Sequence, residues 1–180
     1  MKSVGSYCFY KLFYNCKNIS NSGSLTLPAT TLANSCYMQM FSGCSNLTQA
    51  PALPATTLAN KCYDNMFYNC SSLTQAPALP ATTLASNCYN GMFSGCTSLT
   101  QAPALPATTL ASNCYNGMFS SCSSLTQAPA LPATTLANSC YWYMFSGCDK
   151  FSECHMKASM EGVYDTTTHG DTTKTVIYDL

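Results

Sequence analysis

The chain has 180 residues, including 13 cysteines, 7 basic and 7 acidic residues, so its formal net charge is zero. Charged residues make up 8% of it, against roughly a quarter in average globular proteins, whereas the apolar share of 47% is ordinary for a folded chain. Because there is no basic field, we expect no nucleic-acid partner. No apolar run approaches the roughly 20 residues that span a bilayer, so we expect no membrane insertion.

The N-terminus, from Met1 to Cys8, lacks the apolar stretch of a secretory signal. We expect either that the protein is not exported by that route or that the chain is part of a longer one. The sequence by itself does not define the compartment.

A 26-residue period organises most of the chain. A segment Leu-Thr-Gln-Ala-Pro-Ala-Leu-Pro-Ala-Thr-Thr-Leu-Ala starts at Leu47, Leu73, Leu99 and Leu125, and a segment Cys-Tyr-x-x-Met-Phe-x-x-Cys follows each copy. A degenerate copy of the second segment, from Cys8 to Cys16, brings the total to about six rungs, the first of them incomplete. A unit this short cannot bury an apolar face alone, so the rungs must stack into a solenoid.

Each rung is predicted to contain a strand, a corner and a short helix. Residues 99–104 match the pattern Leu-x-x-Leu-x-Leu with alanine in two leucine positions, which predicts a strand of about three to five residues, shortened by proline. Those two alanines are expected to point inward. From Leu110 onward, apolar residues follow helical spacing and predict a short helix or 3₁₀ turn. The residue before the second cysteine is Gly or Asn in most copies, which indicates a left-handed helix C-terminus.

The two ends differ from the repeats. Residues 162–178 read as a β-hairpin around Gly170, so we expect a solenoid over residues 1–154 and a capping hairpin over residues 155–180. Residues 1–24 carry three lysines and no acid, whereas residues 149–180 carry six acids and three lysines. We expect an uncapped first rung to be adhesive, which predicts end-to-end self-association.

The motif Met92-Phe93-Ser94-Gly95-Cys96-Thr97-Ser98-Leu99, followed by Leu105-Pro106, resembles the BspA-like leucine-rich repeats of bacterial surface proteins. The resemblance covers residues 13–148. It implies an α/β leucine-rich-repeat solenoid, an extracellular or cell-surface location, and a role in adhesion through contact with a protein or a glycan.

Twelve of the 13 cysteines fall in two columns of the repeat, and Cys154 occupies the first alanine position of a last rung. We interpret them as ladders of small buried hydrophobic residues. Disulfides between stacked rungs are an alternative, and metal binding is a weaker one because both histidines, His155 and His169, lie outside the repeats. The tyrosine column is interpreted as half-buried core with its hydroxyl groups reaching water, and alternatively as a platform for sugars.

The candidate ligand-binding residues are uncharged. A glutamine on each strand could form a ladder of side-chain amides or an exposed binding strip flanked by threonine. Trp142 and Tyr143 break the repeat and are further candidates, as are Lys61 and Asp64. The predicted strip is Gln49, Gln75, Gln101, Gln127, Thr48, Thr74, Thr100 and Thr126.

No catalytic constellation is present, because residues 26–147 contain no histidine and only two charged residues, Lys61 and Asp64. We therefore expect no enzyme, no cofactor and no metal. The predicted function is recognition or adhesion through the solenoid surface. Alternatives are a spacer in a longer surface or virion fibre protein and, because Thr82-Thr83 and Thr108-Thr109 recur, an ice-binding protein.

Overall fold

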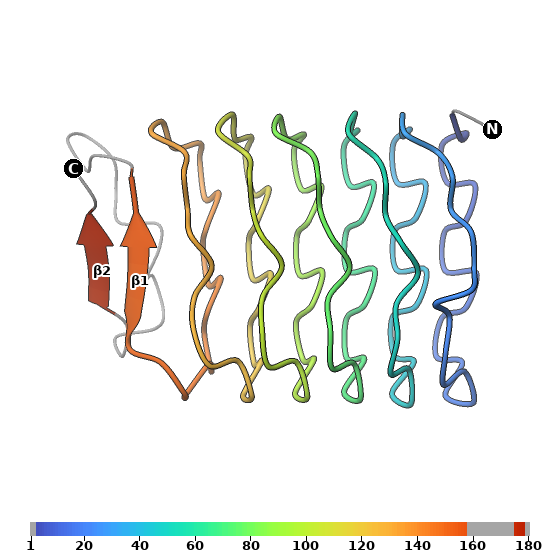
Figure 1. The fold of residues 1–180 in the computed structure, drawn as a ribbon. Coiled ribbons are helices and arrows are strands. Elements are labelled where there is room, and N and C mark those ends of the chain that lie inside the picture. The colour runs from blue at the N-terminus through green and yellow to red at the C-terminus, as the bar shows by residue number, and fades with distance from the viewer. Residues whose placement is uncertain (1–2, 158–174, 179–180) are drawn as a thin grey trace.

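The computed structural model describes residues 3–157 and 175–178. The chain forms a solenoid in which stacked rungs follow one another from the N-terminus to the C-terminus, each with two layers of backbone (Figure 1). We number the rungs 1 to 6, starting at residues 3, 33, 59, 85, 111 and 137. Each begins with a turn half that holds its two cysteines and continues with an extended half, which holds the prolines of rungs 1 to 5. The predicted repeat solenoid is confirmed.

The turn half is a series of turns, so the predicted short helix is wrong, and the alternative of a 3₁₀ turn agrees only with the i to i−3 hydrogen bonds. In rung 2 the N–H of Met40 donates to the carbonyl of Tyr37 (3.1 Å), an i to i−3 bond, whereas the N–H of Tyr37 donates to Cys62 in the next rung (2.9 Å). Alternate N–H groups therefore bond within and between rungs. A helix would use its N–H groups internally and would keep neighbouring axes about 8–10 Å apart. Here the stacked rings are only 5.2–5.9 Å apart.

Every fourth residue of the turn half has a left-handed backbone. In rung 2 these residues are Ser35 (φ 55°), Gln39 (φ 54°) and Gly43 (φ 76°). The predicted left-handed position before the second cysteine is confirmed, but it closes a turn, not a helix. The apolar spacing misled the prediction because pairs of buried residues four apart fit both a helix face and this four-residue series of turns.

The extended halves of rungs 1 to 5 contain no regular strand, so the predicted strand of three to five residues is wrong for these rungs, and rung 6 alone has a four-residue strand in the described residues, Glu153–Met156. In rungs 1 to 5 the pairing is reduced to isolated parallel bridges, such as Gln49 with Gln75 and Thr83 with Thr109. The prolines shorten the strands more than expected, because each proline lacks an N–H that a hydrogen-bonded ladder between rungs would need.

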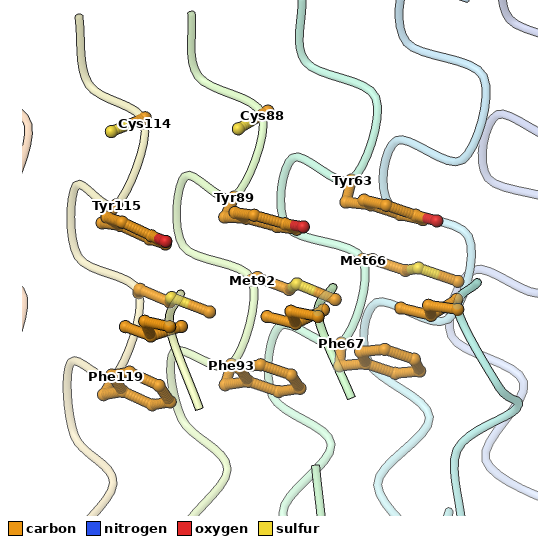
Figure 2. Packing of buried hydrophobic residues seen from close by; sticks show 14 of the residues in the cluster. Tyr63, Met66, Phe67, Cys88, Tyr89, Met92, Phe93, Cys114, Tyr115 and Phe119 are labelled. Carbon is orange, nitrogen blue, oxygen red and sulfur yellow. The ribbon is translucent and has the colours of Figure 1, made fainter. Parts of the chain in front are cut away.

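The core lies between the two halves. The buried side chains repeat in columns, and Figure 2 shows the cysteine, tyrosine, methionine and phenylalanine columns in register along the stack. Tyr63 and Tyr89 stack with centroids 5.9 Å apart at 3°, and Phe67 and Phe93 stack at 5.7 Å and 3°. The leucine and alanine of the extended half, such as Leu105 and Ala107, cover the rings from the other side. Each rung thus buries the ring faces of its neighbours.

The described C-terminal residues form a two-stranded parallel sheet. Strand β1 (Glu153–Met156) pairs with β2 (Thr175–Tyr178), and Met156 also bridges to Leu131 of rung 5. β2 lies within the second strand of the predicted hairpin but pairs in parallel with β1. The first hairpin strand falls in residues 158–174, outside the described residues. The bridge places Cys154 level with Pro129, one position from the predicted Ala128 column.

Candidate ligand-binding face

The extended halves present a row of exposed polar side chains, as predicted. The four predicted glutamines and four predicted threonines are all exposed. In the described part of the chain no side-chain hydrogen bond joins one glutamine to another, although the backbones of Gln49 and Gln75 form a bridge. The hydroxyl groups of Thr48 and Thr126 donate to carbonyl oxygens of Ser20 (2.7 Å) and Thr100 (3.1 Å) in the preceding rung. In the described residues the side-chain amides of the four glutamines are therefore exposed and form no ladder.

Beside this row, the neighbouring rungs from rung 2 to rung 5 enclose shallow hollows lined by proline and alanine. Hollows of about 410, 380 and 320 Å³ lie between rungs 2 and 3, 3 and 4, and 4 and 5. A smaller hollow of about 210 Å³ adjoins them between Gln75 and Gln101. We call this surface the Pro–Ala face. Its residues are Ala52, Pro54, Ala78, Pro80, Ala104, Pro106, Ala130 and Pro132.

The sequence analysis missed these hollows because it placed both alanines of the strand inward. Ala104 is exposed, and the inward side chains are Leu105 and Ala107, which are 4% and 1% exposed. The sequence signal for the hollows is the pair of prolines in each of rungs 2 to 5, which have an alanine and an inward leucine between them. Small side chains repeated in register leave a groove open between neighbouring prolines.

Trp142 and Tyr143 belong to a different surface. They lie on the turn half of rung 6, are 36% and 41% exposed, and stack with ring centroids 5.1 Å apart at 24°. Tyr143 has a φ of 53°, at the position where rungs 4 and 5 have Gly91 and Gly117. A tyrosine in this backbone region is costly, and such strain often accompanies functional sites. The structure does not join this aromatic pair to the glutamine row.

Lys61 and Asp64, the two charged residues within the repeats, differ in their exposure. Lys61 is exposed, whereas Asp64 is 4% exposed and accepts hydrogen bonds from the side-chain amides of Asn65 and, at 3.4 Å, of Asn90 in the next rung. Burial raises the pKa of Asp64 above its ordinary value, although the two amides and Lys61 oppose this shift. Asp64 is therefore a buried polar contact and not a charge offered to a ligand.

All thirteen cysteines lie in the described residues and none forms a disulfide; eleven are buried, which confirms the buried ladders for rungs 2 to 6. The second cysteine of a rung also makes a hydrogen bond: the thiol of Cys96 donates to the carbonyl of Phe67 in the preceding rung (3.2 Å), and Cys122 does the same to Phe93 (3.1 Å). The described residues contain no group of His, Cys, Asp or Glu that could hold a metal ion.

The tyrosine column is core, as interpreted: its members from Tyr37 to Tyr141 are only 1–2% exposed. The expected exposed hydroxyl is wrong for Tyr89, whose hydroxyl is buried and has no hydrogen-bond partner among the described residues. A platform for sugars is therefore not available on this column.

The repeated rungs, the leucine, phenylalanine and cysteine columns and the open lateral face define a leucine-rich repeat solenoid. The family model described as BspA type leucine rich repeat region, in six copies, matches residues 2–129 and 60–172. The chain belongs to this family. No curated protein and no solved structure matches it. No helix in the described residues is long and apolar enough to cross a membrane.

Proposed function

We propose that this chain is a recognition or adhesion module that binds a protein or a glycan through the lateral surface of the solenoid. Membership in the BspA-type family supports a module for protein interaction or adhesion, without an enzymatic role. The family also supports a location at the cell surface or outside the cell, and residues 155–180 would cover the last rung of the solenoid.

The Pro–Ala face together with the glutamine row is the observation that carries this proposal. It offers neutral apolar hollows in register along at least four rungs, with exposed amides at one side. Amide groups bind sugar hydroxyls and peptide groups alike, and shallow apolar hollows bind the faces of sugar rings or small side chains. The regular spacing suits an extended ligand that contacts several rungs, which adds avidity.

A glycan array and a host-protein screen test this function, using the whole chain and four variants. Ala104→Glu places a charge in two hollows, and Gln101→Ala removes one amide; both should weaken binding. Ser123→Glu adds the same charge to an exposed position on the turn half of rung 5 and is the matched control. Trp142→Ala tests the separate aromatic pair. Binding that only Trp142→Ala weakens would move the site to rung 6.

A spacer in a longer surface or virion fibre protein is the alternative. The monotony of the stack favours it, since rungs 2 to 5 present almost the same side chains. Failure to find any ligand at high protein concentration would contradict recognition and support the spacer.

Ice binding is a third function to test. The threonine pairs Thr82-Thr83 and Thr108-Thr109 are exposed and in register, with a parallel bridge from Thr83 to Thr109. Absence of thermal hysteresis and of ice shaping would exclude it.

A further inference from the structure

The turn half of rung 6 differs from those of rungs 4 and 5 at two adjacent positions. Where rungs 4 and 5 have Asn90-Gly91 and Asn116-Gly117, rung 6 has Trp142-Tyr143. The tyrosine, methionine and phenylalanine of rung 6 remain those of the repeat and are buried in the core columns. The change is therefore confined to two exposed side chains, and the packing of the core does not require it.

These two positions face the side of the solenoid and not its end. In rung 5, which has a described rung on both sides, Asn116 and Gly117 are also partly exposed. The N–H of Gly117 donates to the carbonyl of Trp142 (2.7 Å), so the aromatic pair continues the columns that contain Asn116 and Gly117. The exposure of Trp142 and Tyr143, 36% and 41%, therefore belongs to the lateral surface of the turn halves.

Trp142 and Tyr143 form an ordered aromatic platform. Their rings stack with centroids 5.1 Å apart at 24°, so each ring restricts the orientation of the other. Tyr143 holds its place with a φ of 53°, a left-handed backbone that the glycines of rungs 4 and 5 adopt at lower cost. A costly residue at an exposed position that adds nothing to the core is typical of a binding site.

The surface next to the platform is open and carries side-chain amides. A β-carbon on Gly117 would meet no atom within 4 Å, so there is room on rung 5 beside Tyr143. The side-chain amide of Asn116 donates to the side-chain oxygen of Asn113 (3.2 Å), which holds the Asn116 amide in place. The side-chain oxygen of Asn116 accepts no hydrogen bond from the described residues. A fixed acceptor thus lies beside the aromatic pair.

The stretch that carries this surface is neutral. Residues 65–148 contain no charged residue and no histidine, so a charged ligand finds no opposite charge there. A neutral ligand with an apolar face and hydroxyl groups fits better. The C–H face of a sugar ring packs against tryptophan and tyrosine rings, and its hydroxyl groups form hydrogen bonds with amides.

We propose that Trp142 and Tyr143 form a carbohydrate-binding site on the turn half of rung 6, in which a neutral sugar ring packs on the aromatic pair and a hydroxyl group donates to Asn116. The site is separate from the Pro–Ala face, which lies on the extended halves. Proline-rich peptides also pack on exposed aromatic residues, but they dock in grooves lined by several of them. Glycine and asparagine lie beside this pair instead, which favours the sugar.

Tryptophan fluorescence tests the site directly, because Trp142 is the only tryptophan of the chain. Short oligomers of glucose, N-acetylglucosamine, mannose and galactose serve as probes, and at least one of them should shift or quench the emission in a saturable way. Heparin and an oligoproline peptide should leave it unchanged. The absence of a response to all four sugars overturns the proposal, as does a response to heparin or to the peptide.

Three variants take their new residues from equivalent positions in other rungs, so the fold accommodates them. Trp142→Asn and Tyr143→Gly should each weaken binding of the same sugar about tenfold or more, as measured by calorimetry. Tyr143→Gly should not lower the urea midpoint, because glycine adopts the left-handed backbone at less cost. Tyr68→Ser removes a 40% exposed tyrosine from the turn half of rung 3 and should leave binding unchanged.

Sugar binding that survives both rung 6 variants, or that Tyr68→Ser weakens equally, overturns the proposal. The outcome is independent of the Pro–Ala face. Ala104→Glu should leave the fluorescence response of Trp142 intact, so either site can fail without the other.

Discussion

The side-chain oxygen of Asn69 lies in the space that a β-carbon on Gly95, in the next rung, would need. Asn15 has the same relationship to Gly43. In this column of the stack a side chain and a glycine alternate, as Asn15, Gly43, Asn69, Gly95, Ser121 and Gly147. The glycine therefore serves two needs, a left-handed backbone and room for the asparagine of the rung before it.

Gly95→Ala should destabilise the protein more than Gly117→Ala. Both positions are left-handed, which costs an alanine about 1–2 kcal/mol. A β-carbon on Gly117 meets no atom within 4 Å, whereas one on Gly95 collides with Asn69, so about 1–3 kcal/mol of overpacking is added. Urea unfolding midpoints measure the difference. In the double variant with Asn69→Ala, most of the added cost of Gly95→Ala should disappear; equal costs for the two glycines would contradict this packing.

Two thiols of the native protein should react quickly with a disulfide reagent, and eleven only after unfolding. Cys8 and Cys16 are exposed, and the remaining thiols are buried. Burial also raises the pKa of Cys36 to about 11 and of Cys62 to about 12, which lowers the reactive thiolate fraction at neutral pH. A time course at low protein concentration gives the count. Cys8→Ser with Cys16→Ser should abolish the fast phase, and a fast phase that persists would place the exposed thiols elsewhere.

Stability should fall as the pH rises above about 9. The folded pKa values of Cys36 and Tyr37 are raised to about 11 and 12 from 9.0 and 10.0, chiefly by burial. The unfolded chain therefore loses protons that the folded chain still holds, and folding becomes less favourable with each unit of pH. The contribution is complete below pH 9 and is lost by about pH 12. Urea midpoints measured from pH 7 to pH 11 under reducing conditions should decrease; a constant midpoint would contradict burial of the thiols.

Asp64→Asn should stabilise the protein at neutral pH by about 1 kcal/mol, the usual effect of a repeat-consensus residue. Rungs 4 and 5 have Asn90 and Asn116 at this position. Because burial raises the pKa of Asp64, the folded state favours its neutral form, so its destabilising effect grows as the pH rises through its pKa. The gain from the substitution should shrink in acid, where Asp64 is already protonated. Thermal midpoints at neutral and acidic pH check this, and an equal gain at both would contradict it.

The sequence by itself determined the period, the stacked columns and the burial of the cysteines. When identical repeats of 26 residues stack, each residue lies beside the equivalent residue of the next rung. It also identified the left-handed position at Gly43 and Gly95 and the exposed row of glutamines. These features depend on local residue type and on the periodicity, and both can be read without coordinates.

Tertiary structure decided how the backbone satisfies its hydrogen bonds. The spacing of the buried residues Cys36, Tyr37, Met40 and Phe41 fits a helix face as well as it fits a series of turns. The contact with the next rung decides between the two, because it accepts hydrogen bonds from alternate N–H groups that a helix would use internally. The same contact opens the hollows beside Ala104. The thirteen cysteines and the few charged residues of the composition already indicate that the rungs stack. How the backbone hydrogen bonds run from one rung to the next is decided only by the contact between rungs.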